Sequence, residues 1–324
     1  MDYSKVQGID KPVSRLVQGT VMVNGENPEE EFALLDAIYD LGCTTFDTAH
    51  VYSNGANERA VGAWVRERNL RDKVVIIGKG AHHNADRKRV TPFDISADIH
   101  DSLARFQFDT IDLYLLHRDD PSQPVEPIID ILNEHLGAGR IRAFGGSNWS
   151  VARFHEANAY AERNGLVPFA ASSPNFSLAE QAKEPWPGCV SVSGDQGREA
   201  RAFYKEQATA LFTWSSLAGG FFSERFRRDN LASFESYLDK LCVETYCTEA
   251  NFTRLDRVKE LAEAKGLSVP QVALTYVLSQ PLNIFALVGC QTPEEFEANK
   301  EALTLELSAE EVAWLELATD EKPF

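Results

Sequence analysis

The chain has 324 residues, of which 44% are hydrophobic and 25% are charged, values that are ordinary for a globular protein with a sizeable core. Its formal net charge of −17 argues against binding to nucleic acid or to an anionic membrane surface. No apolar run approaches membrane-spanning length, and the N-terminus lacks the pattern of a signal peptide. The five cysteines are scattered and include no CxxC pair, so we expect reduced thiols in a cytoplasmic protein and no metal site.

Apolar runs and helical segments alternate along most of the chain. The first residues predict a short N-terminal β-hairpin, with runs at 6–8 and 14–18 on either side of a polar turn at 9–12. Asn27 and Pro28 predict a helix start, because Asn suits the N-cap and Pro suits the first helical position, and Gly42 ends this helix. Further strands are expected at 44–47, 74–79, 110–116, 141–147, 168–172, 209–214 and 284–288. The helices between and after them are expected at 57–68, 93–106, 126–136, 150–163, 197–206, 252–264, 269–279 and 293–300.

This alternation predicts an α/β fold, a (β/α)8 TIM barrel that forms a single domain over residues 1–324. Two segments, 178–196 and 216–250, are long for a connection between a strand and the next helix. Because both follow strands, we expect them to lie over the C-terminal face of the barrel and to serve as substrate and cofactor loops.

Four of the predicted strands end in polar or charged side chains. In chain order these are Asp47, Lys79, His117 and the pair Ser147-Asn148, and Tyr52 follows five residues after Asp47. A charge inside a parallel sheet is costly to desolvate, so such groups belong at the strand ends. The C-terminal strand ends are where a (β/α)8 barrel carries its active site.

This set of side chains suits proton transfer to a carbonyl oxygen. A phenol is a poor acid at neutral pH, but an adjacent ammonium group favours the phenolate and lowers the pKa of the phenol. An aspartate beside the ammonium holds it charged, and a histidine at the next strand end can orient the reacting oxygen. No nucleophilic serine or cysteine is implied, so the set predicts carbonyl reduction or alcohol oxidation with a hydride-carrying cofactor.

The motifs FDTAHVYSNGANERAVG, VVIIGKG, LYLLHRDD, GGSNWS, WSSLAGG and VGCQTPEEFEANKEAL resemble those of the aldo-keto reductase superfamily. The resemblance runs from about residue 13 to 318 in consistent order and spacing. It implies an oxidoreductase that interconverts an aldehyde or ketone and the corresponding alcohol with NAD(H) or NADP(H). It also implies the catalytic roles: Tyr52 as general acid, Lys79 lowering the pKa of Tyr52, Asp47 supporting Lys79, and His117 orienting the carbonyl.

The resemblance carries over the cofactor-binding positions as well. The nicotinamide end is implied to lie near Ser147, Asn148, Ser173 and Trp214, where Ser173 replaces a glutamine that many relatives have. The pyrophosphate loop and the end of the first strand correspond to Ser215, Leu217, Gly219, Gly19 and Thr20. The last motif supplies Gly289, Gln291, Glu295 and Asn299 for the adenine end. Taken alone, Trp214 would also fit the core, and Asn299 an exposed helix position.

The last motif also bears on the choice of cofactor. Relatives often have a cation at the position of Gln291 or Glu295, which receives the 2′-phosphate of NADPH. An amide and a carboxylate at these positions forfeit charge-assisted hydrogen bonds and add repulsion, which favours NAD(H). Three arginines in the second long segment, Arg225, Arg227 and Arg228, are an alternative phosphate site.

The substrate side is less defined by the sequence. We expect His50, Arg118, Trp149 and Trp186 to surround the mouth of the barrel, while His82-His83 fits either the mouth or a solvated loop. Imidazole, guanidinium and indole groups would suit a hydroxylated, sugar-like carbonyl compound. A nicotinamide-nucleotide-sensing regulatory subunit with slow turnover is the alternative function, and net alcohol oxidation is a further one. The oligomeric state stays open.

Overall fold

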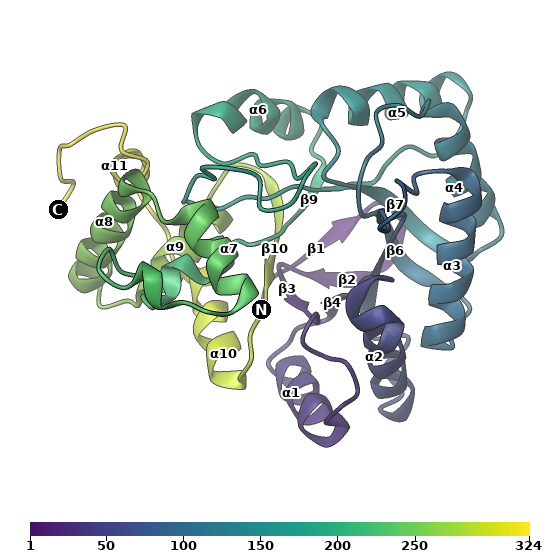
Figure 1. Cartoon of the computed structure of the whole chain (residues 1–324), viewed down its shortest axis with the longest axis horizontal. Coiled ribbons are helices and arrows are strands. Elements are labelled where there is room, and N and C mark those ends of the chain that lie inside the picture. The colour runs from purple at the N-terminus through teal and green to yellow at the C-terminus, as the bar shows by residue number, and fades with distance from the viewer.

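Eight parallel strands close into a ring in the computed structural model, which describes residues 1–324 (Figure 1). Around the barrel the strands follow one another in chain order, and the last pairs with the first, Ala286 lying opposite Leu16. The predicted (β/α)8 barrel is therefore confirmed. The strands are β3 (Leu16–Gly19), β4 (Thr45–Asp47), β5 (Val75–Gly80), β6 (Ile111–Leu116), β7 (Ile141–Ser147), β8 (Ala171–Ser173), β9 (Ala210–Thr213) and β10 (Asn283–Val288).

The helices lie outside the strands, and most begin at a residue that can cap them. Ser268, for example, accepts a hydrogen bond from the backbone of Gln271, whose side chain returns one to Ser268. Nine predicted helices are present: α1 (Pro28–Asp40), α2 (Ala56–Glu67), α3 (Pro92–Phe106), α4 (Glu126–Gly137), α5 (Val151–Arg163), α6 (Arg198–Glu206), α8 (Glu249–Lys265), α9 (Val269–Leu278) and α10 (Pro293–Glu301). Two others, α7 (Tyr237–Tyr246) and α11 (Ala309–Leu315), were not predicted.

The N-terminal hairpin is present, but its predicted boundaries are wrong. Strands β1 (Tyr3–Val6) and β2 (Ile9–Ser14) pair antiparallel, with Val6 opposite Ile9. The turn is made at Gly8, which has a φ of 84°, and the polar residues predicted as the turn lie within β2. Pro12 is accepted there because β2 is an edge strand and lacks a partner for that position. Residues 16–18 belong to the barrel strand β3 instead.

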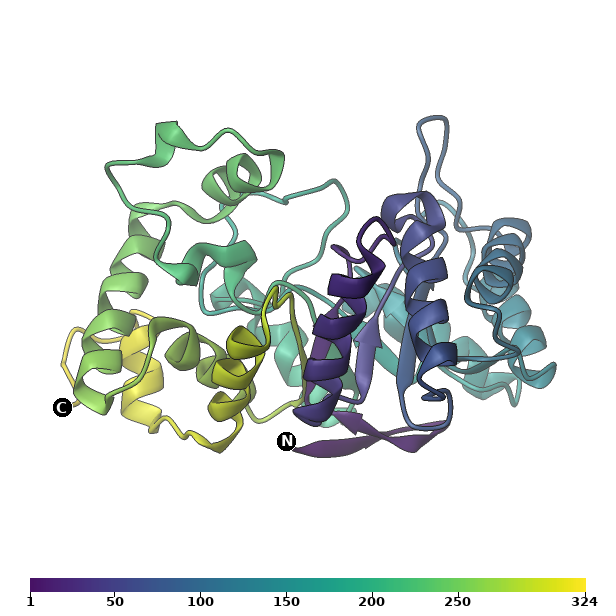
Figure 2. The ribbon, with the colours of Figure 1, turned by 90° about the horizontal axis from the view of Figure 1, so that it is seen from below.

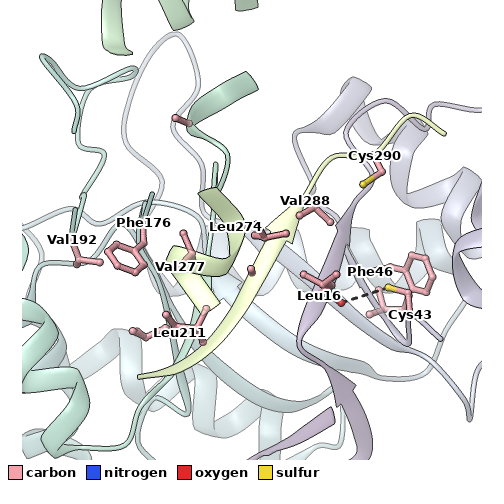
Figure 3. Packing of buried hydrophobic residues seen from close by; sticks show 14 of the residues in the cluster. Leu16, Cys43, Phe46, Phe176, Val192, Leu211, Leu274, Val277, Val288 and Cys290 are labelled. Atoms are coloured by element: carbon pink, nitrogen blue, oxygen red, sulfur yellow. Dashed lines mark hydrogen bonds between the residues drawn. The ribbon is translucent and has the colours of Figure 1, made fainter. Parts of the chain in front are cut away.

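The core has an inner and an outer layer. Side chains from the hairpin and from alternate strand positions fill the barrel, among them Val13, Ile77 and Phe212. The outer layer joins the opposite strand faces to the helices and holds 65 buried residues, so it is the larger core. Figure 3 shows part of it, with Leu274 and Val277 of α9 beside β10.

The two long segments lie on the side of the barrel opposite to the hairpin, as predicted (Figure 2). The first connects β8 to α6, and the second connects β9 to α8 and contains α7. They contact each other, since Ala182 donates a backbone hydrogen bond to Thr245 and the Trp186 indole donates one to Tyr237. Together they form one cover over part of the C-terminal face.

None of the helices is both long enough and apolar enough to cross a membrane.

Candidate active site

A buried ion pair lies at the C-terminal ends of β4 and β5. Asp47 is the last residue of β4 and pairs in register with Ile77, which places it close to Lys79 two residues further along β5. The Lys79 ammonium is 2.5 Å from Oδ1 of Asp47, and both residues are only 4% exposed. Burial acts to lower the pKa of Lys79, but the negative charge of Asp47 and the neighbouring Tyr52 together raise it above its ordinary value.

Tyr52 lies in the loop after β4, with its ring next to this ion pair. The loop is held by His50, whose backbone amide donates to the Lys79 carbonyl at 2.8 Å. As a result, the Lys79 ammonium lies 5.1 Å from the centre of the Tyr52 ring. The ring of His117, which follows β6, lies 5.9 Å from the Tyr52 ring in an edge-on arrangement. The structure thus brings all four predicted catalytic residues together.

The electrostatics of Tyr52 differ from the sequence-based expectation. Burial raises the pKa of the Tyr52 phenol, Lys79 lowers it, and the charge of Asp47 raises it again. The net pKa lies above the ordinary value of 10.0. The expected lowering by Lys79 is present but is outweighed, mainly by burial and then by the opposing charge of Asp47. Tyr52 is therefore protonated throughout the neutral range.

His117 is neutral at physiological pH. Burial lowers the pKa of its imidazole well below the ordinary value, and the charges of Lys79 and Arg118 lower it further. Its Nδ1 atom is buried and has no hydrogen-bond partner. A second imidazole, that of His82, lies edge-on at 4.9 Å. His117 can therefore form a hydrogen bond to a substrate oxygen without adding a full charge.

A polar cluster occupies the ends of β7 and β8, next to His117. The Ser147 hydroxyl and the Asn148 backbone amide both donate to the Ser173 carbonyl, at 3.0 and 3.1 Å. The Asn148 amide group also accepts a hydrogen bond from the backbone of Val190 in the first long segment. Trp214, directly after β9, is partly exposed, and its indole N–H has no partner. Trp214 is thus not simply a core residue.

The loop after Trp214 has an irregular backbone with open space beside it. Ser215 and Gly219 both have positive φ values, 52° and 62°, and Leu217 lies between them. A side chain at Gly220 would meet no atom within 4 Å, so the loop has open space beside it. The role of Ser215, Leu217 and Gly219 in binding the pyrophosphate stays a prediction.

The last predicted motif forms the N-terminus of α10. The Glu295 carboxylate accepts a hydrogen bond from the Gln291 backbone amide at 2.8 Å and so places a negative charge beside the N-terminus of this helix. Asn299 is only 6% exposed and donates to the sulfur of Cys290, so the exposed helix position is excluded. The remaining residues of this region are Gly289, with open space beside it, and Gly19 and Thr20 at the end of β3.

The three arginines of the second long segment are already paired. Arg225 binds Asp239 at 2.8 Å and Arg227 binds Asp229 at 3.2 Å. Arg228 binds both Glu249 and Asp256, at 2.7 and 3.0 Å. The positive charges of the alternative phosphate site are therefore neutralised by these carboxylates.

Two of the predicted substrate contacts point away from the mouth. The imidazole of His50 faces α3, where it lies 3.3 Å from Asp101. Trp149 is completely buried and packs edge-on against Phe169, so its predicted place at the mouth is wrong. Asn148 has a φ of 59°, and this reversal sends the next side chain inward. The ring of Trp186 lies 6.4 Å from that of Trp214, and its contact with substrate stays a prediction.

A cavity of about 660 Å³ opens beside Arg118 and Asn148, which directly follow His117 and Ser147 in the chain, and none of the four predicted catalytic residues lines it. Its walls come from the loops after β5, β6, β7 and β8, and they include His83, Arg87, Arg118, Asn148 and Cys189. Of the loop after β5, residues 81–91, the sequence indicated only His82-His83, for which the mouth and a solvated loop were both open. His83 lines the cavity and the His82 ring lies 4.9 Å from that of His117, which places this loop at the mouth. Its length after a strand was the signal that would have indicated it.

Comparison with known proteins agrees with this geometry. The model of the aldo/keto reductase family matches residues 15–319. This chain belongs to the aldo/keto reductase family. An aryl-alcohol dehydrogenase from Pestalotiopsis microspora is 29% identical over 312 residues, which cover 90% of this chain and 73% of that protein. A protein from Oryza sativa subsp. japonica named "Probable voltage-gated potassium channel subunit beta" is 26% identical over 341 residues, covering 100% and 98%.

The solved structure of the glycerol dehydrogenase from Gluconobacter oxydans superposes with a TM-score of 0.77 at 21% identity. It covers 100% of this chain and 98% of its own, which shows a shared fold. Aldo/keto reductases are oxidoreductases that act on alcohols and carbonyl compounds with NAD(P)(H). The family therefore agrees with the class of reaction that the strand-end residues predict.

Proposed function

We propose that this aldo/keto reductase interconverts an aldehyde or ketone and the corresponding alcohol, with Tyr52 as the general acid and base. The observation that carries the proposal is the position of Tyr52 between the Lys79 ammonium, 5.1 Å from its ring, and the His117 imidazole. A tyrosine placed only for packing would not require a buried lysine and aspartate beneath it.

In the direction of reduction, Tyr52 gives its proton to the carbonyl oxygen of the substrate. When bound, the nicotinamide nucleotide supplies the hydride that the carbonyl carbon receives. The phenolate left on Tyr52 is stabilised by the Lys79 ammonium, which Asp47 keeps charged and in place. Neutral His117 donates a hydrogen bond to the same substrate oxygen and fixes its orientation. In the direction of oxidation, Tyr52 accepts the proton instead.

The test of this role is Tyr52→Phe, which removes only the hydroxyl group. We expect turnover to fall by about 10²–10⁴-fold, the usual contribution of a general acid, while the affinity for the cofactor stays nearly unchanged. Tyr160→Phe on α5 is a matched control, because that hydroxyl contacts only Asp130 on the outside of the barrel. If Tyr52→Phe lowers cofactor affinity as much as turnover, Tyr52 is a structural residue and the proposal fails.

For the cofactor we propose a preference for NAD(H). The support is Glu295, whose carboxylate occupies the N-terminus of α10, together with the pairing of all three arginines of the second long segment. NADH and NADPH can be titrated separately while the tryptophan fluorescence is recorded, since Trp214 should respond directly. Tighter binding of NADPH would contradict the preference, and binding of neither would contradict the whole cofactor assignment.

As substrate we propose a small polar carbonyl compound. The cavity that adjoins His117 through Arg118 is lined mainly by polar and charged residues, which supports the hydroxylated, sugar-like class suggested by the sequence. The aromatic part of that hypothesis now depends on Trp186 alone, because Trp149 is buried. Good activity on apolar aldehydes together with none on hydroxylated aldehydes or ketoses would exclude this class.

A nicotinamide-sensing regulatory subunit is a second candidate, favoured by the full-length similarity to the rice protein named as a channel subunit. The complete set of four catalytic residues favours the enzyme. Multiple-turnover kinetics separates the two, because a sensor would complete few cycles with any carbonyl compound or alcohol.

A further inference from the structure

Arg118 is held at the boundary between the four catalytic residues and the cavity. It directly follows His117 at the end of β6 and lines the cavity wall. One guanidinium nitrogen, Nη1, donates to the His117 carbonyl at 2.9 Å, and the Arg118 carbonyl accepts the indole N–H of Trp149 at 3.2 Å. Arg118 is therefore held at two points, its backbone carbonyl and its guanidinium group.

Arg118 is the cation of this cavity that lacks an acidic partner. Arg87 binds Asp94 at 2.7 Å, Lys88 binds Asp120 at 3.0 Å, and Arg89 binds Asp98 at 2.5 Å. Arg118 forms no salt bridge, although the chain has 49 acidic and only 32 basic residues. Its Nε atom is buried and has no hydrogen-bond partner.

The free part of Arg118 has a defined shape. Because Nη1 is engaged by the His117 carbonyl, the donors left without a partner are Nη2 and the buried Nε, which lie along one edge of the guanidinium. This edge matches the two oxygens of a carboxylate. The acidic cavity residues do not take this place: Asp119 is bound by Arg153 at 3.1 Å, Glu184 accepts from the Gly188 backbone, and Asp86 is exposed.

We propose that Arg118 binds a carboxylate group of the substrate, so that the preferred substrates are small carbonyl compounds that carry a carboxylate. This proposal rests on the proposed carbonyl chemistry at Tyr52. A carboxylate is favoured over a phosphate because a single uncompensated cation with one planar edge matches one negative charge. Arg118 also lies close enough to act on the reaction centre, since its charge contributes to lowering the pKa of His117.

The test uses pairs of substrates that differ only in charge. Straight-chain ω-oxocarboxylates of increasing length are compared with their methyl esters, and kcat/KM is measured for wild type and for Arg118→Gln. We expect wild type to prefer the acid of suitable length by at least tenfold. Arg118→Gln should remove that preference, because the rise in KM for the acid should be at least tenfold larger than any change for the ester. Arg118→Lys, which keeps the charge but loses the planar edge, should restore only part of it.

Other outcomes would overturn the proposal. Equal kcat/KM for acid and ester at every length, or an equal loss for both in Arg118→Gln, would mean that Arg118 only supports the His117 backbone. A stronger preference for the matching ω-oxoalkyl phosphate would assign the cavity to phosphate instead. Arg87→Gln is the matched comparison, because Arg87 is already paired with Asp94, and it should alter the acid-to-ester ratio by less than twofold.

A binding measurement separates this proposal from the proposed function. Calorimetric titration with butanoate and with butanamide, in the presence of the oxidised cofactor, involves no turnover. Binding of butanoate that Arg118→Gln weakens at least tenfold supports the carboxylate site even if no carbonyl compound is reduced. Failure of the acid and the amide to differ, in an enzyme that does reduce carbonyl compounds, overturns the carboxylate site alone.

Discussion

Replacing Asp47 by asparagine tests the buried ion pair that supports Tyr52. The substitution keeps the shape of the side chain but leaves the Lys79 ammonium, 4% exposed, without its counter-charge. Breaking a buried pair costs roughly 3–5 kcal/mol, and we expect about 3 kcal/mol because the asparagine oxygen still accepts a hydrogen bond. With an unfolding entropy of about 2.1 cal/mol/K per residue, a chain of 324 residues should lose about 4 °C in Tm.

The loss should depend on pH in a defined direction. In wild type the pKa of Lys79 is raised, so its contribution to stability is fully present below the unfolded value of 10.5 and is lost as the pH rises through the folded value. In Asp47→Asn, burial is no longer opposed by Asp47, and the pKa of Lys79 should fall below 10.5. The variant should therefore become more stable as the pH rises towards 10.5. The difference in Tm between wild type and variant should be largest near pH 7.

The assay is thermal unfolding of wild type and variant at pH 7 and pH 9.5. The double variant Asp47→Asn with Lys79→Met is the control, because replacing both members of a buried pair by neutral groups is often nearly neutral for stability. A Tm of the single variant within 1 °C of wild type at pH 7, or a double variant that is less stable than the single one, would refute the reasoning.

Three further predictions follow from the site. Because burial raises the pKa of Tyr52, kcat for reduction should be constant up to about pH 10 and fall only above it. The rate of oxidation, in which Tyr52 accepts the proton, should increase as the pH rises towards the pKa of Tyr52. A decline of kcat for reduction with an apparent pKa near 8 would contradict this prediction. The double change Gln291→Arg with Glu295→Gln should lower the NADPH dissociation constant about 10–100-fold, as expected for a charge-assisted hydrogen bond, and an unchanged value in fluorescence titration would locate the phosphate elsewhere. Arg105→Gln should lower kcat about tenfold without changing the affinity for NADH, because Arg105 donates to the His50 carbonyl in the loop that carries Tyr52. A kcat equal to that of wild type would show that this contact does not position the phenol.

The parts of the fold that the sequence predicted well are those fixed by local pattern. The apolar runs of β5 and β6 are buried along their whole length, so composition alone located them. Helix α7 was missed because its apolar residues do not form one buried face: Tyr237 and Leu238 are 66% and 62% exposed, while Cys242 and Tyr246 are buried. Its position depends on contacts with the other long segment, which sequence periodicity does not contain.

Within the candidate site, too, some side-chain positions could be predicted from the sequence and others could not. Asp47 and Lys79 could be placed together because parallel pairing of neighbouring strands fixes the relative position of their ends. Trp149 could not be placed, because its direction is set by a single backbone reversal at Asn148 beyond the strand end. The position of Trp149 therefore required the backbone conformation of the turn, which the sequence pattern does not contain.

The raised pKa of Tyr52 remains compatible with its role as an acid. A general acid must be protonated before the reaction, and burial ensures this at neutral pH. The Lys79 ammonium matters when negative charge develops on the phenol oxygen, so its stabilisation is larger in the transition state than in the resting enzyme. The resting pKa includes the opposing charge of Asp47 and the cost of burial, neither of which can be judged from the sequence. The sequence therefore predicted which groups lie together, whereas the net direction of the pKa required their depth in the folded protein.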